Sequence, residues 1–494
     1  MNAVPVHQES ADASPQPEFV RALSLTDAVM LVAGSMIGSG IFIVSADIAR
    51  AVGSPFWLLM VWVLTGVITL LGALAYGELA AMFPRAGGQY VFLRESMGPL
   101  MGFLYGWTLF VVIQTGTIAA VAVAFSRFLG VLWPSITPDR YGWFPQFDVV
   151  TGGGTIELGL SPQRVVALVS VWLLTWVNLR GVREGKTLQT TLTLVKTGAL
   201  AGLIILGFTV GRNATAIAAN FGPGQFMGTT SFSSVFVIAF GAALVGSLFS
   251  SDAWNNVTFA AAEVHNPRRN LPLALLCGTG LVTLLYLAAN LSYLFVLPLR
   301  GVEGGADVLA RGIQFATQDR VGTAGAEMIF GAAGGTIMAV AILISTFGCN
   351  NGLILAGARV YYAMARDRLF FRSAGTLNAR QVPAVGLVLQ AVWVSLLCLT
   401  GTYGQLLDYV IFAALVFYAL TTIGLFVLRR TRPEMERPYR AVGYPVLPAL
   451  YITLASSVAV ILLVAEKTRA QALSGLVVVL LGIPVYYLWR RLER

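Results

Sequence analysis

Long apolar runs alternate with short polar stretches along almost the whole chain. The runs predict twelve helical segments, covering residues 27–50, 55–82, 97–131, 164–180, 188–211, 231–262, 271–297, 329–364, 383–401, 405–428, 443–465 and 471–490. A helix needs about 20 apolar residues to cross the hydrocarbon core of a bilayer, so these segments have the length of membrane-spanning helices. The fourth is near the lower limit. The third, sixth and eighth are too long for one straight span, which indicates tilted helices, broken helices or amphipathic extensions.

The first segment is interrupted by small residues in its middle. Gly34, Gly38 and Gly40 lie there with Ser35 and Ser39, and a glycine in a helix interior costs about 1 kcal/mol relative to alanine. Two interpretations are open at this point. The glycines let a neighbouring helix approach closely, or they mark an unwound segment that presents backbone N–H groups to a ligand.

The sixth segment contains a second interruption, a run of small and polar residues from Ser247 to Asn256 that includes Asp252. A buried acid at bilayer depth costs at least ~2.5 kcal/mol unless it is paired or hydrated. Two interrupted segments, five segments apart, are typical of a transporter built from inverted repeats. Half-helix N-termini attract a carboxylate, and unwound carbonyls attract an ammonium. A site that offers both predicts an amino acid zwitterion as the substrate.

Composition and charge agree with a membrane protein. Hydrophobic residues make up 57% of the 494 residues and charged residues only 11%, whereas soluble domains carry about 25% charged residues. The mean hydropathy is +0.77. The net charge of +9 does not indicate nucleic-acid binding, because the basic residues form short clusters between the apolar runs. Their distribution predicts that both termini are cytoplasmic and suits a bacterial inner (cytoplasmic) membrane. Residues 1–23 are predicted to form a disordered cytoplasmic tail.

Four stretches of the sequence resemble the L-type amino acid transporter branch of the amino acid–polyamine–organocation superfamily. They are GSMIGSGIF (34–42), AYGELAAMFPRAGGQYVFLRE (75–95), FSSDAWNN followed by EVHNPRRNLP (249–272) and FGCNNGLILAGARVYYAMARD (347–367). The resemblance implies an all-α membrane protein with twelve transmembrane helices, a five-plus-five inverted repeat of the LeuT-like kind, and discontinuous helices 1 and 6. The transport core would cover residues 24–430, with helices 1–5 at 24–211 and helices 6–10 at 231–430. Helices 11 and 12 and a cytoplasmic C-terminus would follow in 431–494.

The resemblance also implies a substrate site at the two breaks. Around Gly38-Ser39-Gly40, backbone groups from Met36 to Gly40 would bind the substrate carboxylate. The backbone carbonyls of Phe249, Ser250 and Asp252 would bind the α-amino group, and the ring of Phe249 would form the outer gate. Many relatives have tyrosine at the position of Ser251 and glycine at the position of Ala253, so the side-chain specificity stays open.

Lys196 lies within the fifth apolar segment. It either extends its long stem to the membrane surface or places a functional cation inside the protein. The resemblance implies the second role, in which the lysine takes the place of a sodium ion and links helices 1 and 8. Its partners would be the Gly38 region and a polar residue such as Ser345. This predicts sodium-independent transport.

Several other charged residues have two interpretations each. Glu78 is expected to be an interfacial acid paired with Arg85 or another base, with proton coupling as the alternative. Asp252 is expected to cap the second half-helix or to attract a cationic substrate side chain. Arg359 is expected to pair with an acid near the cytoplasmic exit, and His265 to be solvated in a loop.

The predicted function is a secondary transporter, an exchanger or facilitator of neutral L-amino acids that works by alternating access. Antiport of cationic amino acids or polyamines, proton-coupled symport and a transporter-like sensor stay open as alternatives. A channel would show a repeated pore ring, and an enzyme would show clustered ligands or a nucleophile with its base; the sequence has neither pattern. We therefore expect no cofactor and no metal site. Animal members of the branch join a heavy chain through a cysteine in the loop at 132–163, which has no cysteine here, so no covalent subunit is expected.

Overall fold

Long α-helices form most of the protein, seen here in a computed structural model that describes residues 19–139, 141–142, 145–151, 154–228, 233–400 and 403–492. The helices in chain order are α1 (Leu25–Met36), α2 (Ser45–Val52), α3 (Pro55–Met82), α4 (Gln89–Met97), α5 (Pro99–Thr108), α6 (Gln114–Leu132), α7 (Pro162–Leu179), α8 (Val182–Thr209), α9 (Ala214–Phe221), α10 (Ser234–Ser250), α11 (Pro267–Val296), α12 (Val308–Arg311), α13 (Val321–Phe330), α14 (Gly334–Arg366), α15 (Ala384–Thr400), α16 (Tyr403–Thr431), α17 (Val446–Val464) and α18 (Glu466–Leu492).

Shorter elements connect or interrupt these helices. The 3₁₀ turns are η1 (Gly40–Phe42), η3 (Trp254–Thr258), η4 (Ala261–Glu263), η5 (Thr317–Asp319), η6 (Gly331–Ala333) and η7 (Arg372–Gly375), and η2 (Leu109–Ile113) is π-helical. Strands β1 (Phe147–Thr151) and β2 (Gly154–Leu158) pair in antiparallel fashion, with Val149 opposite Ile156.

The helices have the length and composition of membrane spans. In the part of the chain that the structure describes, nine helical stretches are long and apolar enough to cross a bilayer. Three shorter apolar helices accompany them, namely α1, α10 and most of α15. Every predicted apolar segment coincides with one or more of these helices. The protein is therefore a helical, multi-pass membrane protein.

Of the three segments that were too long for one span, the third and the sixth are interrupted, and the eighth is one long helix that follows a shorter one. The third contains the π-helical stretch η2 between α5 and α6, where the hydrogen-bond ladder changes register. The sixth ends as an α-helix at Ser250 and continues as the 3₁₀ turns η3 and η4. The eighth is preceded by α13, which η6 separates from α14.

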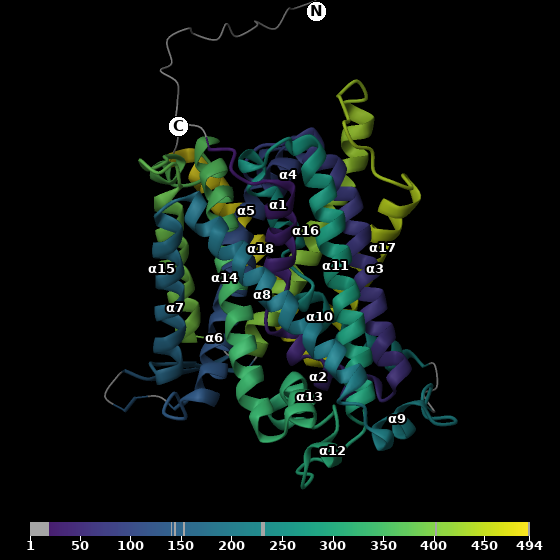
Figure 1. Cartoon of the computed structure of the whole chain (residues 1–494). Coiled ribbons are helices and arrows are strands. Elements are labelled where there is room, and N and C mark those ends of the chain that lie inside the picture. The colour runs from purple at the N-terminus through teal and green to yellow at the C-terminus, as the bar shows by residue number, and fades with distance from the viewer. Residues whose placement is uncertain are drawn as a thin grey trace, which may run out of the picture.

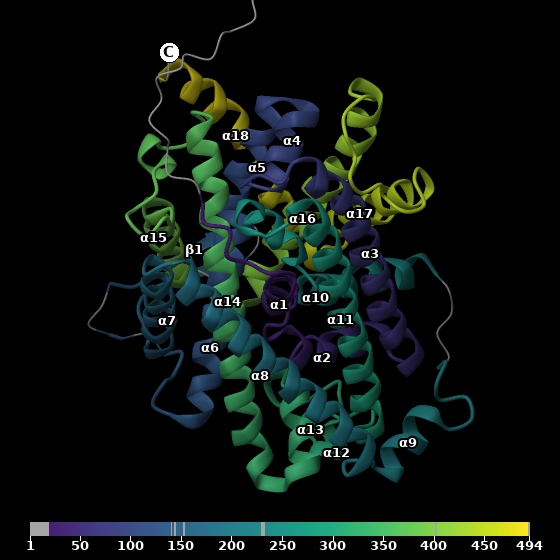
Figure 2. The same cartoon turned by 45° about the horizontal axis from the view of Figure 1, so that its top comes forward.

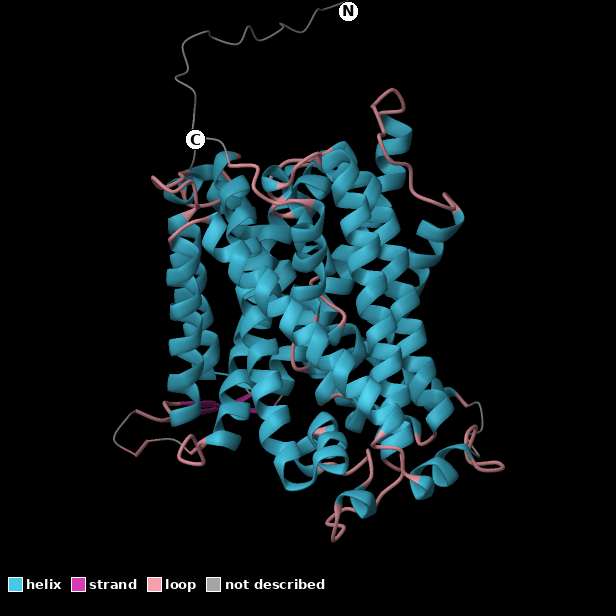
Figure 3. Ribbon diagram, viewed as in Figure 1, coloured by secondary structure: helices cyan, strands magenta, loops and turns pink. Residues whose placement is uncertain are grey.

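The elements at the two ends of the bundle differ. Helix α4 and the C-terminal end of the chain lie at one end, which we call the terminal face, and α9, α12 and α13 lie at the other, which we call the opposite face (Figure 1). The β-hairpin also lies at the opposite face (Figure 3). Such short surface elements close the ends of a bundle whose long helices run between the two faces.

Helix α1 lies in the middle of the bundle, packed against α8, α11, α14 and the turn η3 (Figure 2). A capping box fixes its start, because the backbone N–H of Asp27 donates to Ser24 Oγ and the backbone N–H of Ser24 donates to the Asp27 carboxylate. Every residue from Leu31 to Met36 is buried. This helix can be short because its neighbours, and not lipid, surround it.

Residues 1–18 of the expected tail lie outside the described residues. The remainder, residues 19–23, runs along η4 at the terminal face. The backbone N–H groups of Ala22 and Leu23 donate to the Glu263 carbonyl at 2.9 Å, and Leu23 forms an isolated parallel bridge with Val264.

Candidate functional site

The first helix is broken at Ile37–Ser39. Helix α1 ends at Met36, Ile37 adopts an extended conformation, and the chain resumes as η1 at Gly40 before α2. The glycines on either side of the break serve close packing. A side chain at Gly34 would overlap Gln189 and Thr193 of α8. The structure therefore shows both close helix packing at Gly34 and an unwound segment at Gly38.

The second broken helix is interrupted at Ser251–Ala253. Helix α10 ends at Ser250 and η3 begins at Trp254. Ala253 has φ 63°, in the left-handed region that favours glycine. This explains why glycine is common at this position in the family that the sequence resembles.

The two breaks lie against each other. A Cβ atom on Gly40 would lie 3.1 Å from the Cα of Ser250 and would overlap its hydroxyl. Tyr286 of α11 joins the two helix ends, because its hydroxyl lies 3.1 Å from the Met36 carbonyl and 3.0 Å from the Ser250 carbonyl. The structure thus brings together the residues expected at both breaks, and Tyr286 is a contact that the sequence analysis missed.

Lys196 reaches the first break and not the membrane surface. Its side chain is buried, and Nζ donates to the carbonyls of Gly34 and Ile37, both at 2.6 Å, and of Ser345 at 3.3 Å. The hydroxyl of Ser345 lies 2.9 Å from the Gly38 carbonyl and 3.2 Å from that of Ile37. The ammonium therefore occupies the carbonyl end of α1 and connects α8 to α1 and α14. The negative end of a helix dipole favours a cation at this place.

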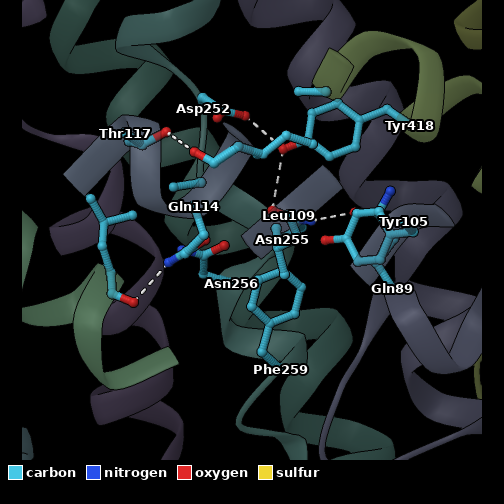
Figure 4. A pocket seen from close by; sticks show the side chains of 14 residues that line it. Gln89, Tyr105, Leu109, Gln114, Thr117, Asp252, Asn255, Asn256, Phe259 and Tyr418 are labelled. Atoms are coloured by element: carbon cyan, nitrogen blue, oxygen red, sulfur yellow. Dashed lines mark hydrogen bonds between the residues drawn. The ribbon is translucent and has the colours of Figure 1, made fainter. Parts of the chain in front are cut away.

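A polar network lies beside the second break (Figure 4). The hydroxyl of Tyr418 donates to Asp252 Oδ1 at 2.6 Å and lies 3.3 Å from Asn255 Oδ1. The amide of Asn255 donates to Gln89 Oε1 at 2.7 Å, and the amide of Gln89 lies 3.0 Å from Thr421 Oγ1. The network holds the unwound segment against α4 and α16.

Asp252 does not cap the second half-helix. The N-cap of η3 is Ala253, and no side chain bonds to the free N–H groups there. The carboxylate instead meets Tyr418 of α16, because the left-handed turn at Ala253 leaves Asp252 outside the cap position. The expectation of a capping role for Asp252 is therefore corrected.

Two small cavities adjoin Asp252. One, lined by residues that include Tyr105, Gln114, Thr117 and Asn256, has a volume of about 10 Å³, and the second, which Ser251 lines, has about 20 Å³. Such a volume holds about one water molecule. Of the seven residues expected to bind the substrate, only Asp252 lines these cavities. An amino acid can enter only when the surrounding helices move apart.

Contacts at the terminal face close one route to the centre. Lys186 of α8 donates to the Ala22 carbonyl and to Asp27, both at 2.8 Å. Deeper inside, Arg359 of α14 pairs with Glu263 of η4 at 2.9 Å, and both side chains are buried. The expected acid partner of Arg359 is therefore Glu263. His265 next to this turn is exposed, as predicted.

Glu78 belongs to a second buried cluster near the same face. Its carboxylate accepts hydrogen bonds from Arg429 at 3.0 and 2.5 Å and from the backbone N–H of Ala441 at 2.7 Å, and Arg437 lies 3.4 Å away. The acid is fully buried inside the protein, four residues before the end of α3. Its base is thus not Arg85.

Arg85 pairs instead with Glu95 at 3.1 Å, and Arg432 donates to the same carboxylate at 2.9 Å. Burial opposes ionisation of Glu95, but these hydrogen bonds hold the pKa of its carboxyl below the usual value. The C-terminal end of α4 is therefore tied to the loop that follows α16.

Contacts at the opposite face close the other route. Arg50 of α2 donates to Asp319 at 2.7 Å and to the Gln314 carbonyl at 2.6 Å. The side-chain amide of Gln314 donates to the Ala49 carbonyl at 3.1 Å. The second half of the first broken helix is thus tied to the turn before α13.

Sequence comparison places these features in a family. The model of the amino acid permease family matches residues 23–485. The chain belongs to the amino acid permease family. Members of this family move amino acids across membranes, and the relatives reported below are transporters, not enzymes.

Characterised relatives match this permease along nearly its whole length. It is 28% identical to the serine/threonine exchanger SteT of Bacillus subtilis (strain 168), over 94% of this chain and 96% of the relative. It is 28% identical to the human b(0,+)-type amino acid transporter 1, over 98% and 90%. It is 29% identical to the human large neutral amino acids transporter small subunit 2, over 97% and 83%.

Proposed function

We propose that this permease is a sodium-independent exchanger or facilitator of neutral L-amino acids that works by alternating access. One observation carries the proposal, the ammonium of Lys196 on the carbonyls of Gly34, Ile37 and Ser345. These oxygens, at the C-terminal end of a half-helix, are the kind of group that coordinates a coupling ion in broken-helix transporters. A lysine fixed there supplies the positive charge from the protein itself, so the transport cycle needs no sodium ion.

The substrate would bind between the two breaks. Backbone groups of Met36, Gly38, Ser39 and Gly40 would hold its carboxylate, because the chain restarts as a helix there with N–H groups that have no partner within the helix. The α-amino group would meet the carbonyls of Phe249, Ser250 and Asp252, where α10 ends. The close approach of Gly40 to Ser250 supports one shared site.

Asp252 favours a second candidate, a substrate with a cationic side chain. Its carboxylate is buried and lines the central cavity, and within the described ranges no lysine or arginine pairs with it. A buried carboxylate without a base is costly, and a substrate cation would compensate for it. Competition of arginine, leucine and alanine for uptake of labelled alanine separates the two candidates, since strong competition by arginine would favour the second.

Glu78 gives proton coupling no support, because Arg429 and Arg437 already surround its carboxylate. The two guanidinium groups and the backbone N–H of Ala441 occupy this carboxylate as parts of a structural cluster. We therefore place the driving force in the amino acid gradients.

The architecture follows from the same reasoning. We propose that α1, α10 and α15 complete twelve spans, with repeats at residues 24–211 and 231–430 and two additional helices in 431–494. The two broken helices then stand first in their repeats, which suits the LeuT-like arrangement. We expect no covalently bound subunit, so the chain would act alone in the inner membrane.

The terminal face would lie in the cytoplasm. Basic residues gather there: Arg85, Arg94 and Arg432 all pair with Glu95, and Arg268 pairs with Glu436. An impermeant maleimide applied to intact cells tests this orientation. Arg212→Cys, between α8 and α9, should react and Arg183→Cys, in the first turn of α8, should not; the reverse pattern would place the termini outside.

Sodium independence is tested in proteoliposomes loaded with unlabelled alanine. Uptake of labelled alanine should proceed at the same rate in sodium and in choline buffer, and a collapse in choline would contradict the proposal. Comparison with empty liposomes separates exchange from facilitated diffusion. Binding without any flux would identify a sensor.

The gate is tested at Phe249, in the last turn of α10. Phe249→Ala should impair transport, because the ring would no longer cover the bound substrate. Phe240→Ala on the same helix is the matched control, since that ring packs 5.7 Å from Trp57 and away from the break. If both variants transport like the unmodified protein, the assignment of the gate is wrong.

A further inference from the structure

A large cleft opens at the opposite face, away from the two breaks. Its volume is about 580 Å³, far more than the cavities next to Asp252. The wall combines the last turns of α6, the start of α7 and the turn before α13. An amino acid fits into this space without any movement of the helices.

Three arginines line the cleft, Arg127 of α6, Arg164 of α7 and Arg320 before α13. No aspartate or glutamate is among the described residues that line it. Three like charges around one space repel one another, and burial together with Arg127 lowers the pKa of Arg320 to about 10. Among the described residues, the cleft is therefore lined by three bases and no acid.

Arg127 and Arg320 retain hydrogen-bonding capacity for a ligand. Arg164 donates to the Gly159 carbonyl at 2.7 Å, and Arg127 lies 3.5 Å from the Gln318 carbonyl. The Nε of Arg320 is buried and has no hydrogen-bond partner in the described part of the chain. A buried N–H without an acceptor costs about 1–3 kcal/mol, so an acceptor is missing from this place.

The turn before α13 holds Arg320 in position. Gln318 and Asp319 both have left-handed backbones, with φ 54° and 61°, which is rare for residues other than glycine. The turn sends Asp319 to Arg50, the contact that closes the opposite face, and Arg320 into the cleft. Strained backbone of this kind is concentrated at ligand sites and switches.

Helix α6 connects the cleft with the centre. Gln114 and Thr117 line the cavity of about 10 Å³ next to Asp252, and Arg127 lines the cleft. Ten residues of helix separate Thr117 from Arg127, a distance of about 15 Å at 1.5 Å per residue. The cleft thus lies along α6 from the proposed substrate site, toward the opposite face.

We propose that this cleft is a second binding site, specific for an oxyanion held by Arg127, Arg164 and Arg320. The oxyanion is either the carboxylate of an amino acid on its way to or from the centre or the phosphate of a bilayer lipid. Guanidinium groups bind both through paired N–H donors. Only the amino acid as occupant rests on the proposed function; the oxyanion site itself does not.

Arginine modification tests the site directly. The full-length protein in detergent is treated with phenylglyoxal, and the rate of modification is followed at each arginine by peptide mass spectrometry. Acetate at about twice its dissociation constant should slow the modification of Arg320 and Arg127 about threefold, whereas ethylamine, which has no carboxylate, should not. Arg212, an exposed arginine at the same face over the ring of Phe295, is the internal control and should react equally under all conditions.

Two further arms identify the occupant and test cooperation. In nanodiscs that contain phosphatidylglycerol, protection of Arg320 without acetate would assign the site to lipid phosphate, and protection that still requires acetate would assign it to a free carboxylate. In Arg320→Gln, acetate should no longer protect Arg127, whereas Arg212→Gln should leave that protection intact. Absence of protection in detergent and in nanodiscs would overturn the proposal. Because no step depends on flux, protection without alanine transport would refute the proposed function alone.

Discussion

Replacement of Lys196 by methionine separates a role in transport from a role in folding. Methionine has a similar length but no ammonium, so Lys196→Met removes the donor that reaches Gly34, Ile37 and Ser345 at 2.6, 2.6 and 3.3 Å. The two short bonds contribute about 1.5–3 kcal/mol each. Burial of the ammonium costs several kcal/mol, and the variant loses this cost together with the bonds.

The lost bonds and the avoided cost of burying the ammonium roughly cancel. The net effect of Lys196→Met on stability is therefore the cost of leaving a buried carbonyl oxygen without a donor. Ile37 keeps the hydroxyl of Ser345 at 3.2 Å as an alternative donor, so Gly34 is the carbonyl left without its buried partner. The expected loss in the free energy of unfolding is therefore about 1–3 kcal/mol, the cost of one such group. The variant should fold, with a lower melting temperature in detergent.

Transport should fall by much more, at least tenfold, because the link that joins α1 to α8 and α14 is gone. Uptake of labelled alanine into proteoliposomes measures this loss, at equal amounts of reconstituted protein. Lys467→Met is the matched control; Lys467 is exposed, pairs with Asp47 at 2.8 Å, and such a surface pair contributes about 0–1 kcal/mol.

A third variant tests the cation role itself. Lys196→Ala leaves space beside the same carbonyl oxygens, so sodium should partly restore its transport, whereas Lys196→Met, whose side chain fills the space, should not respond. Wild-type uptake by Lys196→Met would refute the reasoning. Equal insensitivity of both variants to sodium would show that the lysine does not stand in for an ion.

Three more variants test individual contacts. Arg359→Met should lower the free energy of unfolding by about 3–5 kcal/mol, because Glu263 would stay buried without a partner. The double variant with Glu263→Met should recover most of this loss in thermal melts, and an unchanged melt of the single variant would contradict the prediction. Ala253→Gly should raise stability by up to about 1 kcal/mol, since its φ of 63° is unfavourable for a residue with a Cβ; a lower melting temperature would argue otherwise. Tyr418→Phe removes the hydroxyl at 2.6 Å from Asp252, so arginine should compete better against alanine uptake, and an unchanged ratio of the two would exclude the carboxylate from substrate selection.

The positions of the helices could be predicted from the sequence because a bilayer imposes a simple rule. Each apolar segment corresponds to helix, and the two segments with mid-span small residues contain the breaks, at Ile37–Ser39 and Ser251–Ala253. Glycine and serine weaken a helix locally, whatever surrounds it. The precise ends could not be predicted, because η3 and η4 continue the sixth apolar run without being α-helical.

The sequence could not predict which residues on other helices pair with the buried charged residues. Residue type alone indicated that Lys196, Glu78 and Arg359 need counterparts inside a membrane, but the chain offers several acids and bases for each. The partner of Glu78 is Arg429, 351 positions later. Local pattern carries no information on contacts at such separation.

What the sequence by itself determined is thus the class of protein, its spans, its two helix breaks and the need to compensate its buried charges. These properties follow from transfer of side chains between water and lipid and from local backbone preference. Tertiary structure alone decided that Tyr286 joins the two breaks, that Asp252 meets Tyr418 and does not cap a helix, and that three arginines share one cleft. Each of these contacts joins elements distant in the chain, so it arises only when the helices pack.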